Sequence, residues 1–214
     1  MKTKKESIKR DPEKTQAAIL QQATRIFARS GFHGTGLNEI CQKAKVNKRM
    51  IYHYFGNKLG LYRAVHARGW RELQEWFAKE LMQPEVSPPG AKDEALLLRA
   101  VRIFHDFMAS HQLFLRLLLW DGLEEGAISR SLWQEVRGPI YHQMEVLLEE
   151  AQNKGVLSKG LQASHLIISF MGAISFYYSH AHTMGDIFRK NPLSPEAVEE
   201  RKEQVLALFQ KLMD

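Results

Sequence analysis

Cysteine and long apolar runs are scarce in this sequence of 214 residues. Its single cysteine, Cys41, excludes an internal disulfide framework and is typical of a reducing compartment. No run of about 18 uninterrupted apolar residues occurs, and the most apolar stretch, residues 166–178, is interrupted by serine and glycine. We therefore expect a cytoplasmic protein that has no membrane partner.

Acidic residues are also scarce, but only in the first third of the chain. Residues 1–70 contain 15 lysines and arginines against four acidic residues, a net charge of +11. Residues 71–214 contain 15 against 20, a net charge of −5. A basic segment joined to an acidic one indicates a polyanion-binding module attached to a module with another task. Charge alone leaves open a solvated basic face, so the spacing of residues has to decide.

Alternating strand patterns of useful length are missing, and apolar residues recur at helical spacing instead. The spacing predicts an all-α fold, with Thr35, Asn47 and Ser194 as caps before three of the helices. Gly138-Pro139 should kink or split one helix, and a loop is expected at residues 121–126. The predicted helices cover residues 12–30, 37–44, 48–55, 58–81, 95–109, 113–120, 132–151, 161–182 and 197–213.

Patterns for catalysis and metal binding are absent from the sequence. It has no glycine-rich phosphate loop, no nucleophile elbow and no HExxH pair. His180 and His182 are two residues apart and cannot share one face of an ideal helix. We expect no enzyme activity, no cofactor and no metal site.

The first 55 residues contain three predicted helices, of which the second and third are short and form a helix-turn-helix candidate. A recognition helix must bury one stripe and offer the opposite stripe to the major groove of DNA. Ile51 and Phe55 can supply the buried stripe, with Val46 behind them. The stripe predicted to face DNA consists of Lys48, Arg49, Tyr52 and His53. Phosphates can be met by the hydroxyls of Tyr52 and Tyr54, by the charge of Lys58, and by the helix N-terminus that Asn47 caps.

Over residues 15–62 the sequence resembles the tetracycline-repressor (TetR) family of bacterial transcription regulators. The resemblance implies a DNA-binding domain at residues 1–57 and a ligand-binding and dimerisation domain at residues 58–214, joined by a long helix. It rests on Ala23, Phe27, Gly31, Thr35, Ile40, Ala44, Val46, Ile51, Tyr52, Tyr54, Phe55, Asn57, Lys58 and Leu61.

The resemblance also implies particular DNA contacts. Thr35, Tyr52, Tyr54 and Lys58 would meet phosphates. Lys48, Arg49, Met50 and His53 would face base edges or the adjacent backbone, although for Met50 packing inside the domain is an equal alternative. Lys45 and Asn47, in the turn, complete the predicted DNA-binding set. Lys45 stands where the family usually has glycine, so a left-handed backbone there would be strained.

The acidic second domain has a surplus of large aromatic residues and scattered hydroxyl groups. Together with the resemblance, these predict an apolar effector pocket lined by Trp120, Tyr141, Phe170 and Tyr177. The net charge of −5 favours a neutral or cationic ligand over an anion. Dimerisation is expected through the last two predicted helices, with an interface that includes Val205, Leu206, Phe209 and Leu212.

The sequence therefore predicts a homodimeric, sequence-specific transcriptional repressor. It would bind double-stranded DNA at an inverted-repeat operator and be released by a small hydrophobic ligand. Two alternatives stay open at this point. One is a DNA-binding protein with no effector, and the other is a helical small-molecule carrier or enzyme with a coincidental basic face.

Overall fold

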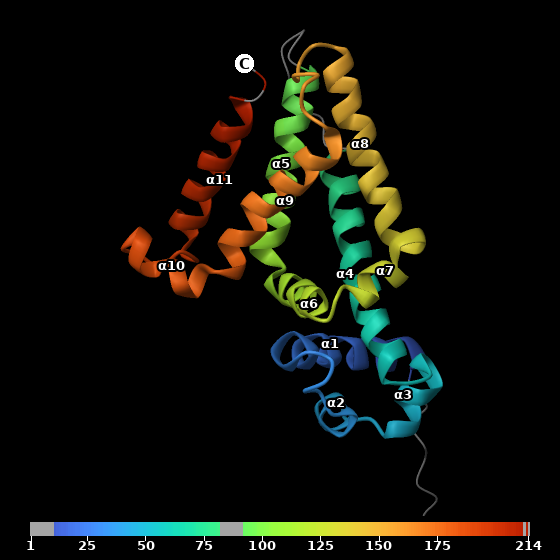
Figure 1. Ribbon diagram of the computed structural model, residues 1–214. Coiled ribbons are helices and arrows are strands. Elements are labelled where there is room, and N and C mark those ends of the chain that lie inside the picture. The colour runs from blue at the N-terminus through green and yellow to red at the C-terminus, as the bar shows by residue number, and fades with distance from the viewer. Residues whose placement is uncertain (1–10, 82–91, 212, 214) are drawn as a thin grey trace, which may run out of the picture.

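The computed structural model describes residues 11–81, 92–211 and 213, and within these ranges it contains helices and turns but no strand. The predicted all-α fold is therefore confirmed. Helices α1 to α3 form a small unit at one end, and α4 runs from it into a larger bundle (Figure 1). The α-helices are α1 Pro12–Ser30, α2 Leu37–Ala44, α3 Lys48–Phe55, α4 Lys58–Leu81, α5 Lys92–Ser110, α6 Gln112–Leu123, α7 Ala127–Ser131, α8 Gly138–Asn153, α9 Ala163–Ser179, α10 Ala181–Phe188 and α11 Pro195–Gln210.

Local signals set the ends of the first helix. The Asp11 carboxylate accepts hydrogen bonds from the backbone N–H groups of Glu13 and Lys14, and Pro12 occupies the first helical turn. Gly31 ends the helix with a φ of 66°, in the region that favours glycine. A side chain at Gly31 would also meet Trp120, because a Cβ there would lie 2.8 Å from the indole Cε3 atom. Gly31 thus ends α1 and admits Trp120 from α6.

The two units share one hydrophobic core. Ile19 and Phe27 of α1, Leu61 and Trp70 of α4 and Phe114 of α6 belong to the same buried cluster. Arg116 Nε and Trp120 Nε1 both donate to the carbonyl oxygen of Ala28, at 3.0 and 3.2 Å, and fasten α6 to α1. The division at residue 57 marks the start of α4, and the packing continues across it.

In the second half of the chain the helices differ from the prediction in three ways. The loop expected at residues 121–126 begins later, because Asp121 still belongs to α6. The buried Asp121 carboxylate accepts hydrogen bonds from the N–H groups of Ile128 and Ser129, both at 2.9 Å, and so supports the unpredicted helix α7. The helix expected over residues 161–182 divides into α9 and α10 around His180.

The predicted irregularity near Gly138-Pro139 is confirmed. Residues Trp133–Arg137 form a π-helical turn that leads directly into α8, with Pro139 in the first turn of α8. The predicted Ser194 cap is also confirmed, since its hydroxyl accepts from the N–H of Ala197 at 3.3 Å.

The stripe on α11 that was predicted to form a dimer interface lies largely inside the subunit. Val205 is 1% exposed and Leu206 is 8% exposed, and both belong to the main core. Phe209 is half-buried and packs against the Phe170 ring at a centroid distance of 5.5 Å. Leu212 lies outside the described residues. The assignment of Val205 and Leu206 to an interface is wrong because helical spacing shows that a stripe is buried, not which partner buries it.

A row of polar aromatic side chains on α4 is buried in the core. The Tyr62 hydroxyl, both ring nitrogens of His66 and the Trp70 indole nitrogen have no hydrogen-bond partner among the described residues. Burial lowers the pKa of His66 to about 4, an effect that nearby Asp121 opposes and Arg137 reinforces. The imidazole is therefore neutral in the folded protein at neutral pH.

This burial predicts a pH-dependent stability. An unfolded histidine takes up a proton near pH 6.5, so between about pH 6.5 and 4 the unfolded chain binds more protons than the folded one. The contribution of His66 to the free energy of unfolding is complete above this window and falls as the pH drops through it, by about 3 kcal/mol. Urea unfolding at a series of pH values measures the change.

The variant His66→Phe should lose this part of the pH dependence. The exposed His33 provides the matched control, because His33→Phe should keep the wild-type dependence. Equal slopes for wild type and His66→Phe would contradict the assignment.

Candidate DNA-binding site

Helices α2 and α3 are joined by a tight turn. Lys45 ends α2 in the left-handed region, with φ 55° and ψ 41°. The N–H groups of Lys45 and Val46 donate to the carbonyl oxygens of Gln42 and Cys41, at 3.3 and 3.0 Å. This pair of hydrogen bonds closes the turn and sets the angle between the two helices.

Helix α3 is capped and anchored as predicted. The Asn47 side chain accepts from the N–H of Met50 at 3.1 Å, and Ile51 is fully buried. Val46 and Phe55 are half-buried and pack against the same core. One stripe of α3 is therefore fixed to the domain, which holds the other stripe in a defined direction.

The opposite stripe of α3 faces solvent. Lys48, Arg49, Tyr52 and His53 are all exposed, and Tyr52 keeps 49% of its surface accessible. Two cations, a phenol and an imidazole on one face provide donors for both phosphate oxygens and base edges. The structure brings together the four residues that the sequence predicted for this stripe.

Other members of the predicted set lie partly in the core. Met50 and Tyr54 are half-buried and pack against the main cluster, so part of each side chain is committed to packing. The Lys58 Nζ atom lies 4.5 Å from the centre of the Phe32 ring, at the start of α4. Lys58 is half-buried and its charge is placed where α4 meets α1 and α3.

Thr35 does not have its predicted role as a cap. Its side chain is 3% exposed, and its hydroxyl donates to the Gly31 carbonyl oxygen at 2.7 Å. The residue that caps α2 is Gly36, which has no side chain to bond the first turn. The buried hydroxyl holds the loop after α1 and does not face DNA. The exposed N-terminus of α2 at Gly36, which the sequence reasoning missed, suits an anion because its first amides lack a side-chain cap.

The four aromatic residues predicted to line an effector pocket do not lie together. Trp120 is bonded to Ala28 in α1, and the Tyr177 hydroxyl donates to the Pro192 carbonyl oxygen at 2.7 Å. Tyr141 lies beside Trp133, and only Phe170 of the four lines the apolar cavity described next. Large aromatic residues serve packing and anchoring at least as well as ligand binding, so counting them could not locate the cavity.

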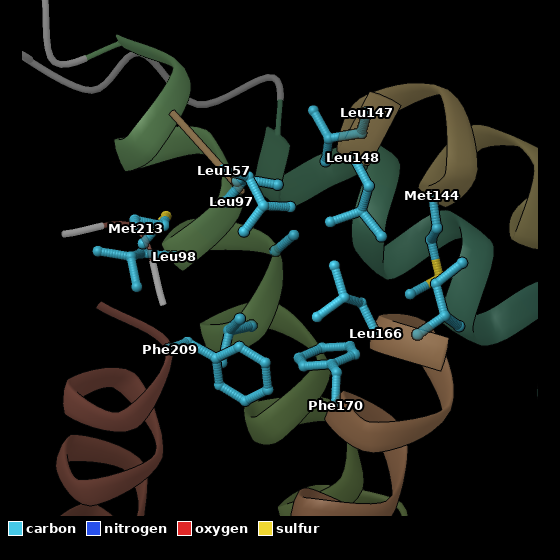
Figure 2. Close-up of a pocket in the computed structure, with 13 residues that line it drawn as sticks. Leu97, Leu98, Met144, Leu147, Leu148, Leu157, Leu166, Phe170, Phe209 and Met213 are labelled. Carbon is cyan, nitrogen blue, oxygen red and sulfur yellow. The ribbon is translucent and has the colours of Figure 1, made fainter. Parts of the chain in front are cut away.

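An apolar cavity of about 70 Å³ lies among α5, α8, α9 and α11. Figure 2 shows leucines, methionines and phenylalanines around it, most of them from these helices. The sequence reasoning missed its aliphatic lining because leucines at helical spacing look like ordinary core residues. Residues that line it include Leu97, Leu98, Met144, Leu148, Leu166 and Phe209.

The described part of the chain contains no group of three or more histidine, cysteine or acidic side chains placed to hold a metal ion. None of its helices is both long and apolar enough to cross a membrane.

A capped recognition helix with a cationic face, joined by α4 to a larger helical bundle, defines a helix-turn-helix DNA-binding regulator. Residues 19–65 match the family model for bacterial regulatory proteins of the tetR family, and residues 94–208 match that for the tetracyclin repressor-like C-terminal domain. The chain belongs to the TetR family of transcriptional regulators. It is a DNA-binding regulator and not an enzyme, so the alternative of a helical enzyme is set aside.

Two curated relatives cover most of the chain. The HTH-type transcriptional repressor SCO4008 of Streptomyces coelicolor is 31% identical over 160 residues, which are 74% of this chain and 75% of the relative. The HTH-type transcriptional repressor NicS of Pseudomonas putida is 27% identical over 188 residues, 86% of this chain and 85% of the relative. Among solved structures, SCO4942 from Streptomyces coelicolor aligns with a TM-score of 0.70 at 20% identity, over 92% of this chain and 97% of that one.

The left-handed turn predicts a stabilising substitution. Lysine pays a steric cost at φ 55° that glycine does not, so Lys45→Gly should raise the free energy of unfolding by about 1 kcal/mol. Lys45→Ala removes the same charge but keeps a Cβ atom, and it should bring no such gain. Chemical denaturation of the three proteins measures the difference, and a less stable glycine variant would contradict it.

Proposed function

We propose that this chain is a repressor that binds an inverted-repeat operator as a homodimer and leaves it when a small hydrophobic ligand binds. The DNA-binding part of this proposal rests on one observation, the exposed stripe on helix α3, which Ile51 anchors. This stripe consists of Lys48, Arg49, Tyr52 and His53. A two-fold dimer presents this stripe twice, so its DNA site should have matching symmetry. The relatives SCO4008 and NicS are both named as repressors, which supports repression over activation. Because its target is chromosomal DNA, we place the protein in the cytoplasm.

The proposed dimer uses the outer faces of α9 and α11. Ile168 and Phe176 on α9 are 66% and 52% exposed, and Leu208 on α11 is 56% exposed. Large apolar side chains that the subunit leaves uncovered on two neighbouring helices suit a helical bundle formed with a second copy. The proposed dimer interface thus still lies on the last helices, as the sequence predicted. It uses their exposed stripe, however, and not the buried stripe that contains Val205 and Leu206.

The proposed effector site starts from the apolar cavity among α5, α8, α9 and α11. Helix α5 packs against α4, and α4 packs against α3, so a change of shape in the bundle can reach the recognition helix. A ligand that separates these helices would change the spacing of the two recognition helices in the dimer. To switch the operator-bound population almost completely, it must bind the released conformation about 5.5 kcal/mol more tightly. The cavity favours this mechanism over an effector-independent DNA-binding protein.

The DNA-binding proposal is tested by selection from a random duplex library. The wild type should return an inverted repeat, with affinity that falls steeply as salt rises. Arg49→Ala should cost about 1–3 kcal/mol and relax selection at one base pair per half-site, if Arg49 reads a guanine. Lys58→Ala should weaken all duplexes alike and lower the salt slope by about one. A selection with no enriched motif would contradict sequence-specific binding.

The dimer is tested by charge on the exposed face of α9. Ile168→Glu combined with Phe176→Glu places like charges near the two-fold axis, so sedimentation should show monomers. Operator affinity should fall roughly 100-fold because each half-site is then bound alone. Leu123→Glu, at an apolar residue that is 78% exposed at the end of α6, is the control and should leave the dimer intact. A double variant that remains dimeric would move the interface to another face.

A further inference from the structure

The charge of Arg137 is held among three aromatic rings. Its guanidinium carbon lies 5.0 Å from the ring centre of Trp70, 5.6 Å from that of Trp133 and 5.4 Å from that of Tyr141. Arg137 Nη2 donates to the Tyr141 hydroxyl at 3.3 Å, while the buried Nε has no hydrogen-bond partner among the described residues. Ring faces attract a cation through their quadrupole. This corner of the bundle thus already holds one organic cation, supplied by the chain itself.

The three rings come from three different segments. Trp70 belongs to α4, Trp133 begins the π-helical turn, and Tyr141 lies in the first turn of α8. A Cβ atom at Gly138 would lie 3.3 Å from Trp133 Nε1, so the glycine lets the indole lie close to the backbone. Single π-helical turns often occur at functional sites. Here the turn sets Trp133 and Tyr141 side by side, with ring centres 5.4 Å apart and an angle of 33° between the planes.

A cleft of about 500 Å³ opens beside these rings, between the π-helical turn with α8 and helix α9. Trp133 and Tyr141 line it, Trp133 is 47% exposed, and Glu145 adds a carboxylate one helical turn beyond Tyr141. No lysine or arginine occurs among the described residues that line the cleft. Ile167 of α9 lines both this cleft and the apolar cavity of Figure 2, and Ile168, which belongs to the proposed dimer face, also lines the cleft. The cleft therefore combines aromatic faces, one negative charge and a neighbouring apolar space.

We infer that this cleft binds the charged end of the effector, and that the effector is an organic cation with an apolar body. The positive group lies against Trp133 and Tyr141 within the field of Glu145, and the apolar body extends past Ile167 toward the cavity. This inference rests on the proposed ligand-controlled repressor and names the class of its ligand. An anion of the same size would meet the Glu145 carboxylate and the negative faces of the rings, so we expect it to bind less tightly.

The same rings connect the cleft to the DNA-binding domain. A bound cation competes with Arg137 for the faces of Trp133 and Tyr141, and Arg137 also contacts Trp70 on α4. In the π-helical turn the Glu135 carboxylate accepts from Arg63 and Arg71 of α4, both at 2.8 Å. Displacing the turn therefore changes what supports α4. Because α4 packs against α3, the cation can alter the position of the recognition helix.

Two ions of nearly the same size and opposite charge provide the test. The full-length protein, without DNA, is titrated calorimetrically with tetraphenylphosphonium and separately with tetraphenylborate. The phosphonium ion should bind at least about tenfold more tightly than the borate ion. Equal affinities, or tighter binding of the borate, would overturn the inference.

Variants locate the bound cation. Glu145→Gln should weaken phosphonium binding roughly three- to tenfold, and Trp133→Ala about tenfold or more, whereas Trp133→Phe should recover part of the loss. Glu149→Gln removes the same charge from an exposed residue one turn further along α8, and its affinity should equal that of the wild type. Unchanged phosphonium affinity in both Glu145→Gln and Trp133→Phe would place the ion elsewhere, even if Trp133→Ala fails to fold.

Binding measurements with operator DNA present test this inference separately from the proposed function. Phosphonium should weaken operator binding, and operator should weaken phosphonium binding by the same factor. Phosphonium bound in the cleft with unchanged operator affinity would overturn the regulatory part of the inference. A protein that binds the cation but selects no operator would instead overturn the proposed repressor.

Discussion

The burial of α4 along much of its length is the constraint on which the rest of the structure depends. Its N-terminal half packs against α1 and α3, and further along it packs against α5, α6 and the π-helical turn. Gly69 makes the close approach to α6 possible, since a Cβ atom there would lie 2.2 Å from the Phe114 ring. Residues that would otherwise form two independent units thus share one core. A movement of α5, α6 or the π-helical turn that displaces α4 therefore reaches the recognition helix.

The packing of α4 also buries polar groups inside the core. Tyr62, His66 and Trp70 occupy successive turns of one buried face, and their polar atoms lack hydrogen-bond partners in the described part of the protein. Such groups cost free energy in a close-packed interior. They lie next to Asp121 and Arg137, which hold α7 and the aromatic cluster in place. Because these groups raise the free energy of the folded interior, this is a region where two conformations can lie close in energy.

Local chemistry accounts for the parts of the fold that the sequence predicted correctly. Asn47, Ser194 and Gly31 act within a few residues of their own position, through caps or a positive φ, so their effect can be read without knowing the fold. The exposed stripe of α3 was predictable for a related reason. With Ile51 fixed as the buried residue, helical geometry sends Arg49 and His53 to the other side.

Longer-range packing accounts for the errors. Thr35 looked like a cap from its neighbours, yet its hydroxyl bonds back to Gly31 and the cap is Gly36. Helix α7 depends on the Asp121 carboxylate, which accepts a hydrogen bond from the Ile128 amide, seven residues further along the chain. No signal within the α7 segment itself therefore predicts this helix. The sequence by itself determined the all-α class, the helix-turn-helix and the stripe of α3 that we propose faces DNA. Only the tertiary structure decided that Val205 is internal, and that Trp133, Tyr141 and Glu145 line one cleft. Helical periodicity specifies which residues share a face and never which surface will cover it.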